Sequence, residues 1–292
     1  MSRFLDLRYA PVGGDLAGQV SVVQATSLAD YATFRLSELR NGLRGRHVLL
    51  VTHGYNVDRA AGIAALSNWE RLLRIPGPGA VLGVLWPGDS SWAHGLDYPA
   101  ELSVADHAGA MLAAFLDAHF QQAASLSFAS HSLGARLVLA AIRVLARPVR
   151  RLILMAGAVD HTSLTGEFAA AAAKVGTISV LASRKDSVLA RLFPLGNFIG
   201  GILDAGHPWL RAAIGRCGPA QPWPANFEAP FEIPDAWDFQ HGNYLQIDAS
   251  PPPVPLLTLP VQVPPQGTGI PAHQARGWQE AFTSAFASTR FR

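Results

Sequence analysis

The chain has 292 residues, of which 49% are hydrophobic and 15% are charged. This is enough apolar material for one large core, so we expect a single domain over residues 1–292. The formal net charge is +2 and Lys and Arg form no runs, which argues against nucleic acid as a partner. The single cysteine excludes an internal disulfide and the cysteine spacing of a zinc or iron–sulfur site, and we expect no metal.

The N-terminal residues do not read as a targeting segment. Asp6 and Arg8 interrupt the apolar residues, and the small-residue cleavage site of a signal peptide is absent. We therefore expect a cytoplasmic protein. No run of about 18 apolar residues occurs along the chain, so we also expect no membrane span.

The first predicted elements are a strand at 19–24 and a helix that follows it. Ser27 is placed to cap this helix, and Tyr31, Phe34 and Leu39 have the spacing of one helical face.

From residue 47 onward, apolar runs of strand length alternate with helical patterns. The predicted strands are 47–53, 80–86, 125–130, 151–155 and 177–181. The predicted helices lie at 56–73 (capped by Asn56 or Asp58), 100–121, 133–146 and near Phe168. Strands joined by helical crossovers build a mostly parallel sheet with helices on both faces, so the predicted fold class is α/β.

The pattern weakens after Asp186. Residues 190–240 mix aromatic side chains with many Gly and Pro, and only short helices can be placed there. The stretch from about 250 to 272 is rich in proline and cannot form a central strand, so we expect an extended surface segment before a C-terminal helix near Trp278.

A pentapeptide at a strand-to-helix junction carries the first chemical signal. Ser130-His-Ser132-Leu-Gly134 lies between the predicted strand 125–130 and the helix 133–146. A Gly-x-Ser-x-Gly turn in this setting presents the serine hydroxyl at the carboxyl edge of the sheet. Ser130 stands in place of the first glycine. The alternative is that Ser132 only caps the helix.

A second signal is His53-Gly-Tyr55-Asn, directly after an earlier apolar strand. This is where a fold with such a serine turn places half of its oxyanion hole, so the expected donors are the backbone N–H groups of Leu133 and Tyr55. The candidate substrate contacts are His53, Trp92 and His131. His131 precedes Ser132 directly in the sequence. In such a turn the side chain of this neighbouring residue points away from the serine hydroxyl, so His131 cannot take the serine proton.

Five motifs together resemble a known superfamily. They are His53-Gly-Tyr-Asn, Leu85-Trp-Pro-Gly, Ser130-His-Ser-Leu-Gly, Ser183-Arg-Lys-Asp186 and His241-Gly-Asn-Tyr. With them the chain resembles the α/β-hydrolase superfamily from residue 47 to about 245, and more narrowly a bacterial hydrolase family without an assigned function. The resemblance implies a triad in the order nucleophile, acid, histidine, which Ser132, Asp186 and His241 match.

Alternatives exist for the acid and for the histidine. Asp186 can instead cap the helix that follows it, and Asp160, after the strand ending at Met155, is the rival acid. His207 and His273 also follow Asp186 and are the rival bases.

These residues predict a serine hydrolase, a carboxylesterase whose partner is a small-molecule acyl substrate, acting through an acyl-enzyme without a cofactor. Only about twenty residues separate the strand ending at Met155 from the next one, which leaves no room for a large cap domain and favours small or medium acyl groups. An amidase or thioesterase with the same triad, and a non-catalytic binding protein on a hydrolase fold, are the alternatives. An interaction protein built around the proline-rich segment is a third.

Overall fold

The structure is a computed structural model that describes residues 2–13, 15–27, 30–73, 79–89, 98–191, 193, 212–228, 231–233, 235 and 238–245. The predicted proline-rich segment and C-terminal helix lie outside the described residues.

Within this part of the chain, nine strands form one sheet in the order β3-β2-β1-β5-β4-β6-β7-β8-β9. The strands are β1 (Arg3–Arg8), β2 (Leu16–Ala25), β3 (Tyr31–Thr33), β4 (His47–Thr52), β5 (Gly79–Leu85), β6 (Ser125–His131), β7 (Val149–Met155), β8 (Val175–Ser183) and β9 (Phe231–Ile233). All neighbours from β1 to β9 pair in parallel, and β2 and β3 add two antiparallel pairings at one edge.

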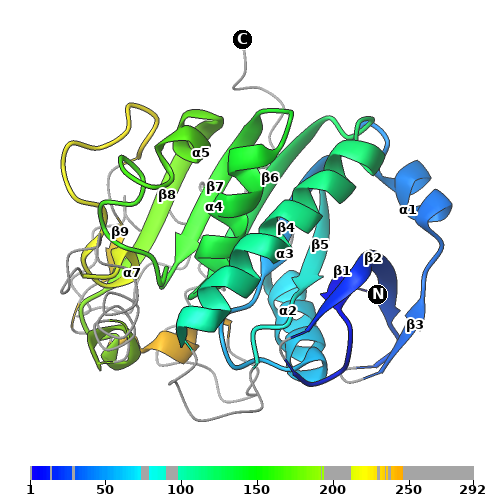
Figure 1. Cartoon of the computed structure of the whole chain (residues 1–292), viewed down its shortest axis with the longest axis horizontal. Helices are drawn as coiled ribbons and strands as arrows, with labels where there is room; N and C mark the ends of the chain where they lie inside the picture. Colours follow the sequence, from blue (N-terminus) through cyan, green and yellow to red (C-terminus); the bar gives the residue numbers. More distant parts are fainter. Residues whose placement is uncertain are drawn as a thin grey trace.

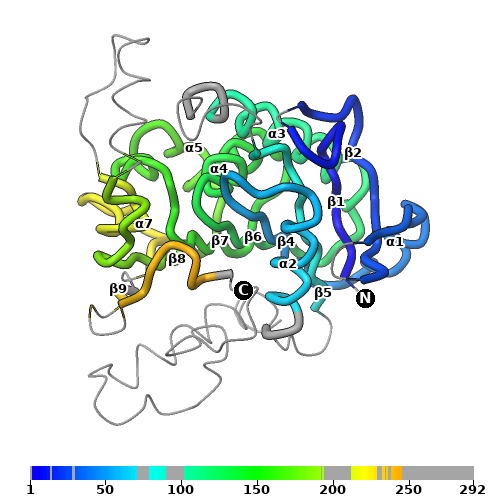
Figure 2. The backbone as a smooth tube through the Cα atoms, turned by 90° about the horizontal axis from the view of Figure 1, so that it is seen from below, coloured from blue at the N-terminus to red at the C-terminus, as the bar shows by residue number. Residues whose placement is uncertain are grey.

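Helices cover both faces of this sheet. They are α1 (Leu36–Leu43), α2 (Arg59–Leu73), α3 (Tyr98–His119), α4 (Gly134–Val144), α5 (Ala169–Ala173) and α7 (Ile214–Cys217), with the short 3-10 helix η2 (His241–Leu245). α3 and α4 lie on one face and α2 on the other (Figures 1 and 2). The predicted α/β class is confirmed, and α5 is the only regular helix between β7 and β8, so no cap domain is inserted there.

The parallel strands end at one edge of the sheet, the lower edge in Figure 1, where η2 also lies. Continuous apolar runs form the central strands because both of their faces are covered; every residue of β7, for example, is buried. None of the helices in the described residues combines the length and hydropathy that a transmembrane segment needs.

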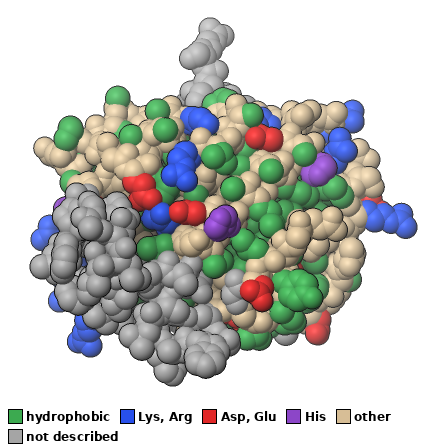
Figure 3. Space-filling view, in the orientation of Figure 1, with side chains coloured by type: hydrophobic (Ala, Val, Ile, Leu, Met, Phe, Trp, Pro, Cys, Tyr) green, Lys and Arg blue, Asp and Glu red, His purple; other side chains and the backbone are tan. Residues whose placement is uncertain are grey.

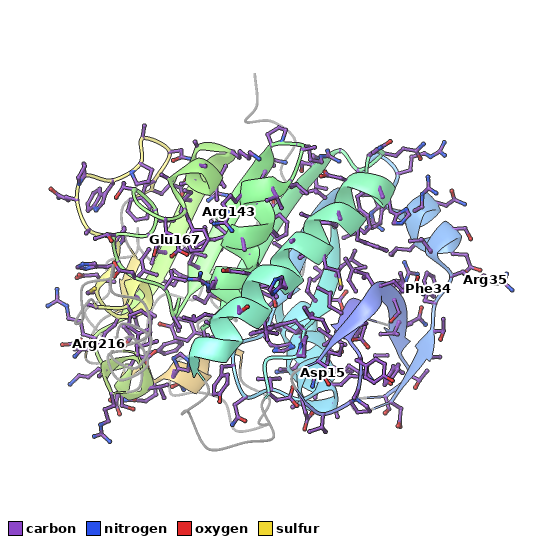
Figure 4. The ribbon with its side chains drawn as sticks, in the orientation of Figure 1. Asp15, Phe34, Arg35, Arg143, Glu167 and Arg216 are labelled. Carbon is purple, nitrogen blue, oxygen red and sulfur yellow. The ribbon has the colours of Figure 1, made fainter. Side chains whose placement is uncertain are left out.

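The N-terminal region differs from the prediction in two ways. Residues 3–8 form an inner strand, β1, although Asp6 and Arg8 interrupt its apolar residues. The helix expected to begin after Ser27 starts only at Leu36, as α1, because Tyr31 begins β3, which pairs antiparallel with β2. Ser27 Oγ accepts the Asp30 N–H at 3.0 Å and closes a turn between the two strands. Phe34, labelled in Figure 4, follows β3 with its ring 4.4 Å from the Arg3 guanidinium.

Candidate active site

Ser132 occupies a strained turn between β6 and α4. Its φ of 53° lies in the left-handed region, which a residue with a Cβ seldom adopts. The turn is held from β7 and the loop after it: Ser132 N donates to Met155 O at 3.0 Å, and Ser132 O accepts the Ala158 N–H at 3.0 Å. Strain of this kind persists only where the surroundings enforce it, and it marks functional turns.

Two glycines allow the chain to pass close to this turn. A Cβ on Gly134 would lie 2.5 Å from His53 O, and a Cβ on Gly54 would lie 2.6 Å from Ser132 Cβ. The His53-Gly turn therefore contacts the serine directly. Ser130, which replaces the first glycine of the motif, is fully buried, and its hydroxyl has no hydrogen-bond partner among the described residues.

Three side chains from distant segments meet at the carboxyl edge of the sheet. His241 Nε2 lies 2.8 Å from Ser132 Oγ, and His241 Nδ1 lies 2.7 Å from Asp186 Oδ2. The carboxylate can only accept, so Nδ1 donates to it and Nε2 is left to accept the serine hydroxyl. The predicted serine, acid and histidine are thus in hydrogen-bond contact, although 109 residues separate the serine from the histidine.

Asp186 serves the helix that follows it as well as His241. Its Oδ1 accepts the Leu189 N–H at 2.9 Å, as a helix cap does, while Oδ2 accepts from the histidine. Asp186 therefore both caps the following helix and contacts His241. The rival Asp160 receives the N–H and the hydroxyl of Thr162, both at 2.7 Å, within its own turn after β7. The rival histidines, His207 and His273, lie outside the described residues.

Two hydrogen bonds fix the backbone around His241. Ser183 Oγ, at the end of β8, donates to Phe239 O at 2.7 Å. His131 Nε2, at the end of β6, donates to His241 O at 2.8 Å. The strand ends therefore hold the loop that presents the imidazole.

His131 lies beside His241, with 4.8 Å between the two ring centroids. Burial, together with the smaller effect of the nearby charge of His241, lowers the pKa of His131 to about 3. A neutral ring with its proton on Nε2 can donate to the His241 carbonyl. The predicted substrate contact is thus a buried support of the histidine loop.

His53 has a comparable supporting place in the turn after β4. It is 1% exposed; Nδ1 donates to Gly54 O at 2.9 Å, and Nε2 accepts the Trp86 N–H at 3.3 Å. Burial lowers the pKa of His53 to about 4. Both ring nitrogens of His53 therefore form hydrogen bonds with the backbone. This environment differs from the contact with substrate that the sequence predicted. Trp92, the third predicted contact, lies outside the described residues.

Two backbone segments lie next to Ser132: the start of α4 and the turn after Gly54. Leu133 begins the turn into α4, and no described group accepts its N–H. Tyr55 follows Gly54, and the next residue, Asn56, donates its N–H to Gly88 O at 2.6 Å. These segments contain the two N–H groups predicted from the sequence to bind an oxyanion. The described residues hold no group of three or more side chains suited to a metal ion.

A mostly parallel sheet covered by helices on both faces, with a strained serine turn after a central strand, defines the α/β-hydrolase fold. The chain belongs to the family described as "Alpha/beta hydrolase of unknown function (DUF900)", whose profile matches residues 33–193. The matched region includes Ser132 and Asp186 and ends before His241. No functionally curated protein has a matching sequence. Membership supports a hydrolase and leaves its substrate open.

Proposed function

We propose that this protein is a serine hydrolase that cleaves carboxylic esters of small or medium acyl size. The observation that carries the proposal is the pair of hydrogen bonds from His241, 2.8 Å to Ser132 Oγ and 2.7 Å to Asp186 Oδ2. This arrangement meets the requirement for activating a serine.

The reaction begins with attack of Ser132 Oγ on the ester carbonyl carbon. His241 Nε2 takes the hydroxyl proton as the new C–O bond forms, and the carbonyl electron pair moves to oxygen. Asp186 stabilises the imidazolium that results. The imidazolium then protonates the leaving alkoxide as the ester bond breaks, which gives an acyl-enzyme. Water, deprotonated by His241, attacks this intermediate, and the imidazolium returns that proton to Ser132 Oγ as the acyl–serine bond breaks, which releases the carboxylic acid.

The negative oxygen of each tetrahedral intermediate requires donors. We assign the backbone N–H groups of Leu133 and Tyr55 to this role. The assignment is supported by the Leu133 N–H, which no described group accepts, and by the contact of the Gly54 turn with Ser132. Such a donor contributes about 3 to 4 kcal/mol of transition-state stabilisation.

Amide and thioester hydrolysis use the same acyl-enzyme chemistry and are the near alternatives within this proposal. A binding protein that uses the fold without catalysis is the alternative of another class, and it requires no hydrogen-bonded serine. The single domain over residues 1–292 and the cytoplasmic location stay predictions.

The first prediction is covalent labelling of Ser132 by a fluorophosphonate probe, because such reagents require an activated serine and oxyanion donors. Intact-mass analysis and peptide mapping locate the adduct. Ser132→Ala should abolish labelling, and His241→Ala and Asp186→Asn should lower esterase turnover by about 10⁴.

The control is Asp160→Asn, which should keep full activity. A dead Asp160→Asn beside an active Asp186→Asn would transfer the role of the acid. If the folded protein is not labelled, or if the adduct lies elsewhere, the hydrolase proposal fails.

A further inference from the structure

A guanidinium is buried behind the turn that contacts Ser132. Arg8 is the last residue of β1, and its side chain is 0% exposed. It forms an ion pair with Asp89 in the loop after β5, and the second carboxylate oxygen of Asp89 accepts the Gly13 N–H at 3.0 Å. The charge is therefore neutralised inside the protein, away from solvent.

The same guanidinium donates to the backbone of three loops. Nη1 donates to Val57 O, after β4, at 3.1 Å and to Trp86 O, after β5, at 2.8 Å. Nε donates to Ala10 O at 3.2 Å and Nη2 to Gly13 O at 3.3 Å, both after β1. Because β1, β5 and β4 are neighbouring parallel strands, one side chain joins the three loops that leave their carboxyl ends.

The loop after β4 is the one that reaches the serine. Gly54 contacts Ser132, Tyr55 follows it, and Asn56 N donates to Gly88 O at 2.6 Å. The turn is thus held at Asn56 by the β5 loop and at Val57 by Arg8, and the β5 loop itself is held by Arg8. Arg8 therefore bonds both the loop that contains Tyr55 and the loop that holds it.

The energetics of buried ion pairs indicate that Arg8 serves to fix the geometry of the loops more than to stabilise the fold. A buried ion pair gains little net stability, because desolvation offsets its attraction, and apolar residues of equal volume often stabilise a protein as well. What Arg supplies is a rigid planar fork of five donors, which can bond several carbonyls and a carboxylate at fixed directions. A lysine keeps the charge but cannot reproduce this pattern.

We propose that Arg8 is a positioning residue that sets the direction of the Tyr55 N–H toward the oxyanion site. The inference rests on the proposed serine hydrolase function. Arg8 touches no substrate atom; it acts through the loop from Gly54 to Val57.

The test compares Arg8→Lys with Arg59→Lys. Arg59 is also buried. It pairs with Asp6 at 2.8 Å and donates to Tyr31 Oη at 2.8 Å and to the backbone carbonyl of Arg8 at 3.2 Å, but its side chain bonds neither the β4 loop nor the β5 loop. For a soluble aryl ester, Arg8→Lys should lower kcat by about 10- to 100-fold with KM nearly unchanged, since small displacements of catalytic groups have effects of this size. The Ki of a trifluoromethyl ketone, which forms an oxyanion, should rise in parallel. Arg59→Lys, measured below its Tm, should keep both values.

Hydrogen exchange provides a readout that is independent of activity. Peptides covering residues 53–58 should exchange about tenfold faster in Arg8→Lys than in Arg59→Lys, while those covering β7 should exchange equally in the two variants. If Arg8→Lys does not fold, the double variant Arg8→Met/Asp89→Leu replaces the buried ion pair with apolar side chains, removes the hydrogen bonds to Val57 O and Trp86 O, and should give the same pattern. Equal kcat and equal exchange in the two variants would overturn the inference and leave the hydrolase proposal intact. An unlabelled wild-type Ser132 would refute the hydrolase proposal, and the role assigned to Arg8 with it.

Discussion

Two buried histidines next to the serine turn are held neutral by the fold. Burial lowers the pKa of His53 to about 4 and of His131 to about 3, from an ordinary value of 6.5. In the unfolded chain both imidazoles take up protons near their ordinary pKa. As the pH falls below about 6.5, the unfolded state therefore binds protons that the folded state does not, and folding stability is lost.

We predict that His131→Gln makes stability less dependent on pH. Each depressed histidine contributes a slope of about 1.4 kcal/mol per pH unit between its unfolded and folded pKa values, with stability rising as pH rises. Removing His131 should reduce the slope of the unfolding free energy by that amount between about pH 6 and about pH 4.5. A glutamine Nε2 can still donate toward His241 O. Urea unfolding over this range measures the slope.

The matched control for that experiment is His107→Gln, which removes an exposed histidine of α3. It should leave the slope as it is in the wild type. An unchanged slope in His131→Gln would mean that this ring is protonated in the folded protein.

The contact among Ser132, Asp186 and His241 could be predicted from the sequence, because Ser132 and Asp186 follow apolar strands and the resemblance to the superfamily implies a histidine after them in chain order. The supporting roles of His53 and His131 could not. A histidine's role depends on which atom faces each ring nitrogen, and for His131 that atom is the carbonyl of a residue 110 positions away.

At the scale of elements, α3 and α4 pack with their backbones in close contact. A Cβ on Gly109 of α3 would lie 2.5 Å from Leu137 O and 2.8 Å from Ala140 Cβ of α4. Arg136 of α4 adds ion pairs to Asp106 at 2.8 Å and to Glu167 at 2.7 Å. Basic and acidic side chains lie side by side on this face in Figure 3, and Figure 4 labels Glu167. Because α4 begins at Gly134, two residues after Ser132, its position also fixes where the serine turn ends.

We predict that Gly109→Ala destabilises the protein, although alanine favours a helix interior over glycine by about 1 kcal/mol. The added methyl meets backbone of α4, and overpacking of this kind costs about 1 to 3 kcal/mol. Thermal unfolding should show a lower Tm for Gly109→Ala. Labelling of Ser132 well below that Tm should persist.

Gly18→Ala is the control, because a Cβ there meets nothing within 4 Å in β2. Its Tm should stay near that of the wild type. A rise in Tm for Gly109→Ala would show that the two helices can separate at no cost.

Elements from β4 to β8 could be predicted to within a few residues, because continuous apolar runs and helical periodicity alternate there. β1 could not, since its charges look unsuited to an inner strand until their partners are known. Arg59 pairs with Asp6 and Asp89 with Arg8, and both partners lie more than fifty residues further along the chain. Ion pairs over such distances leave no local pattern.

At the scale of the whole molecule, the serine site lies on the edge where the parallel strands end, the edge that faces the viewer in Figure 2. The segment from β7 to β8 holds only α5, so it contributes no cap over this edge. Among the described segments, those nearest to Ser132 are the turn after β4, the loop after β7 and the η2 segment. The absence of a cap between β7 and β8 is the basis for the small or medium acyl size proposed above.

We predict that kcat/KM for soluble aryl esters rises over the shortest acyl chains and then levels off. Burial contributes about 0.8 kcal/mol for each methylene that enters a closed apolar tunnel, so a tunnel would give a steady rise of about fourfold per methylene. An open site stops contributing once the chain extends past its walls. Measurement of kcat/KM from acetate to dodecanoate, below the critical micelle concentration of each ester, distinguishes the two cases. A continued rise to dodecanoate would contradict the preference for small or medium acyl groups, while leaving the assignment of Ser132 as nucleophile unaffected.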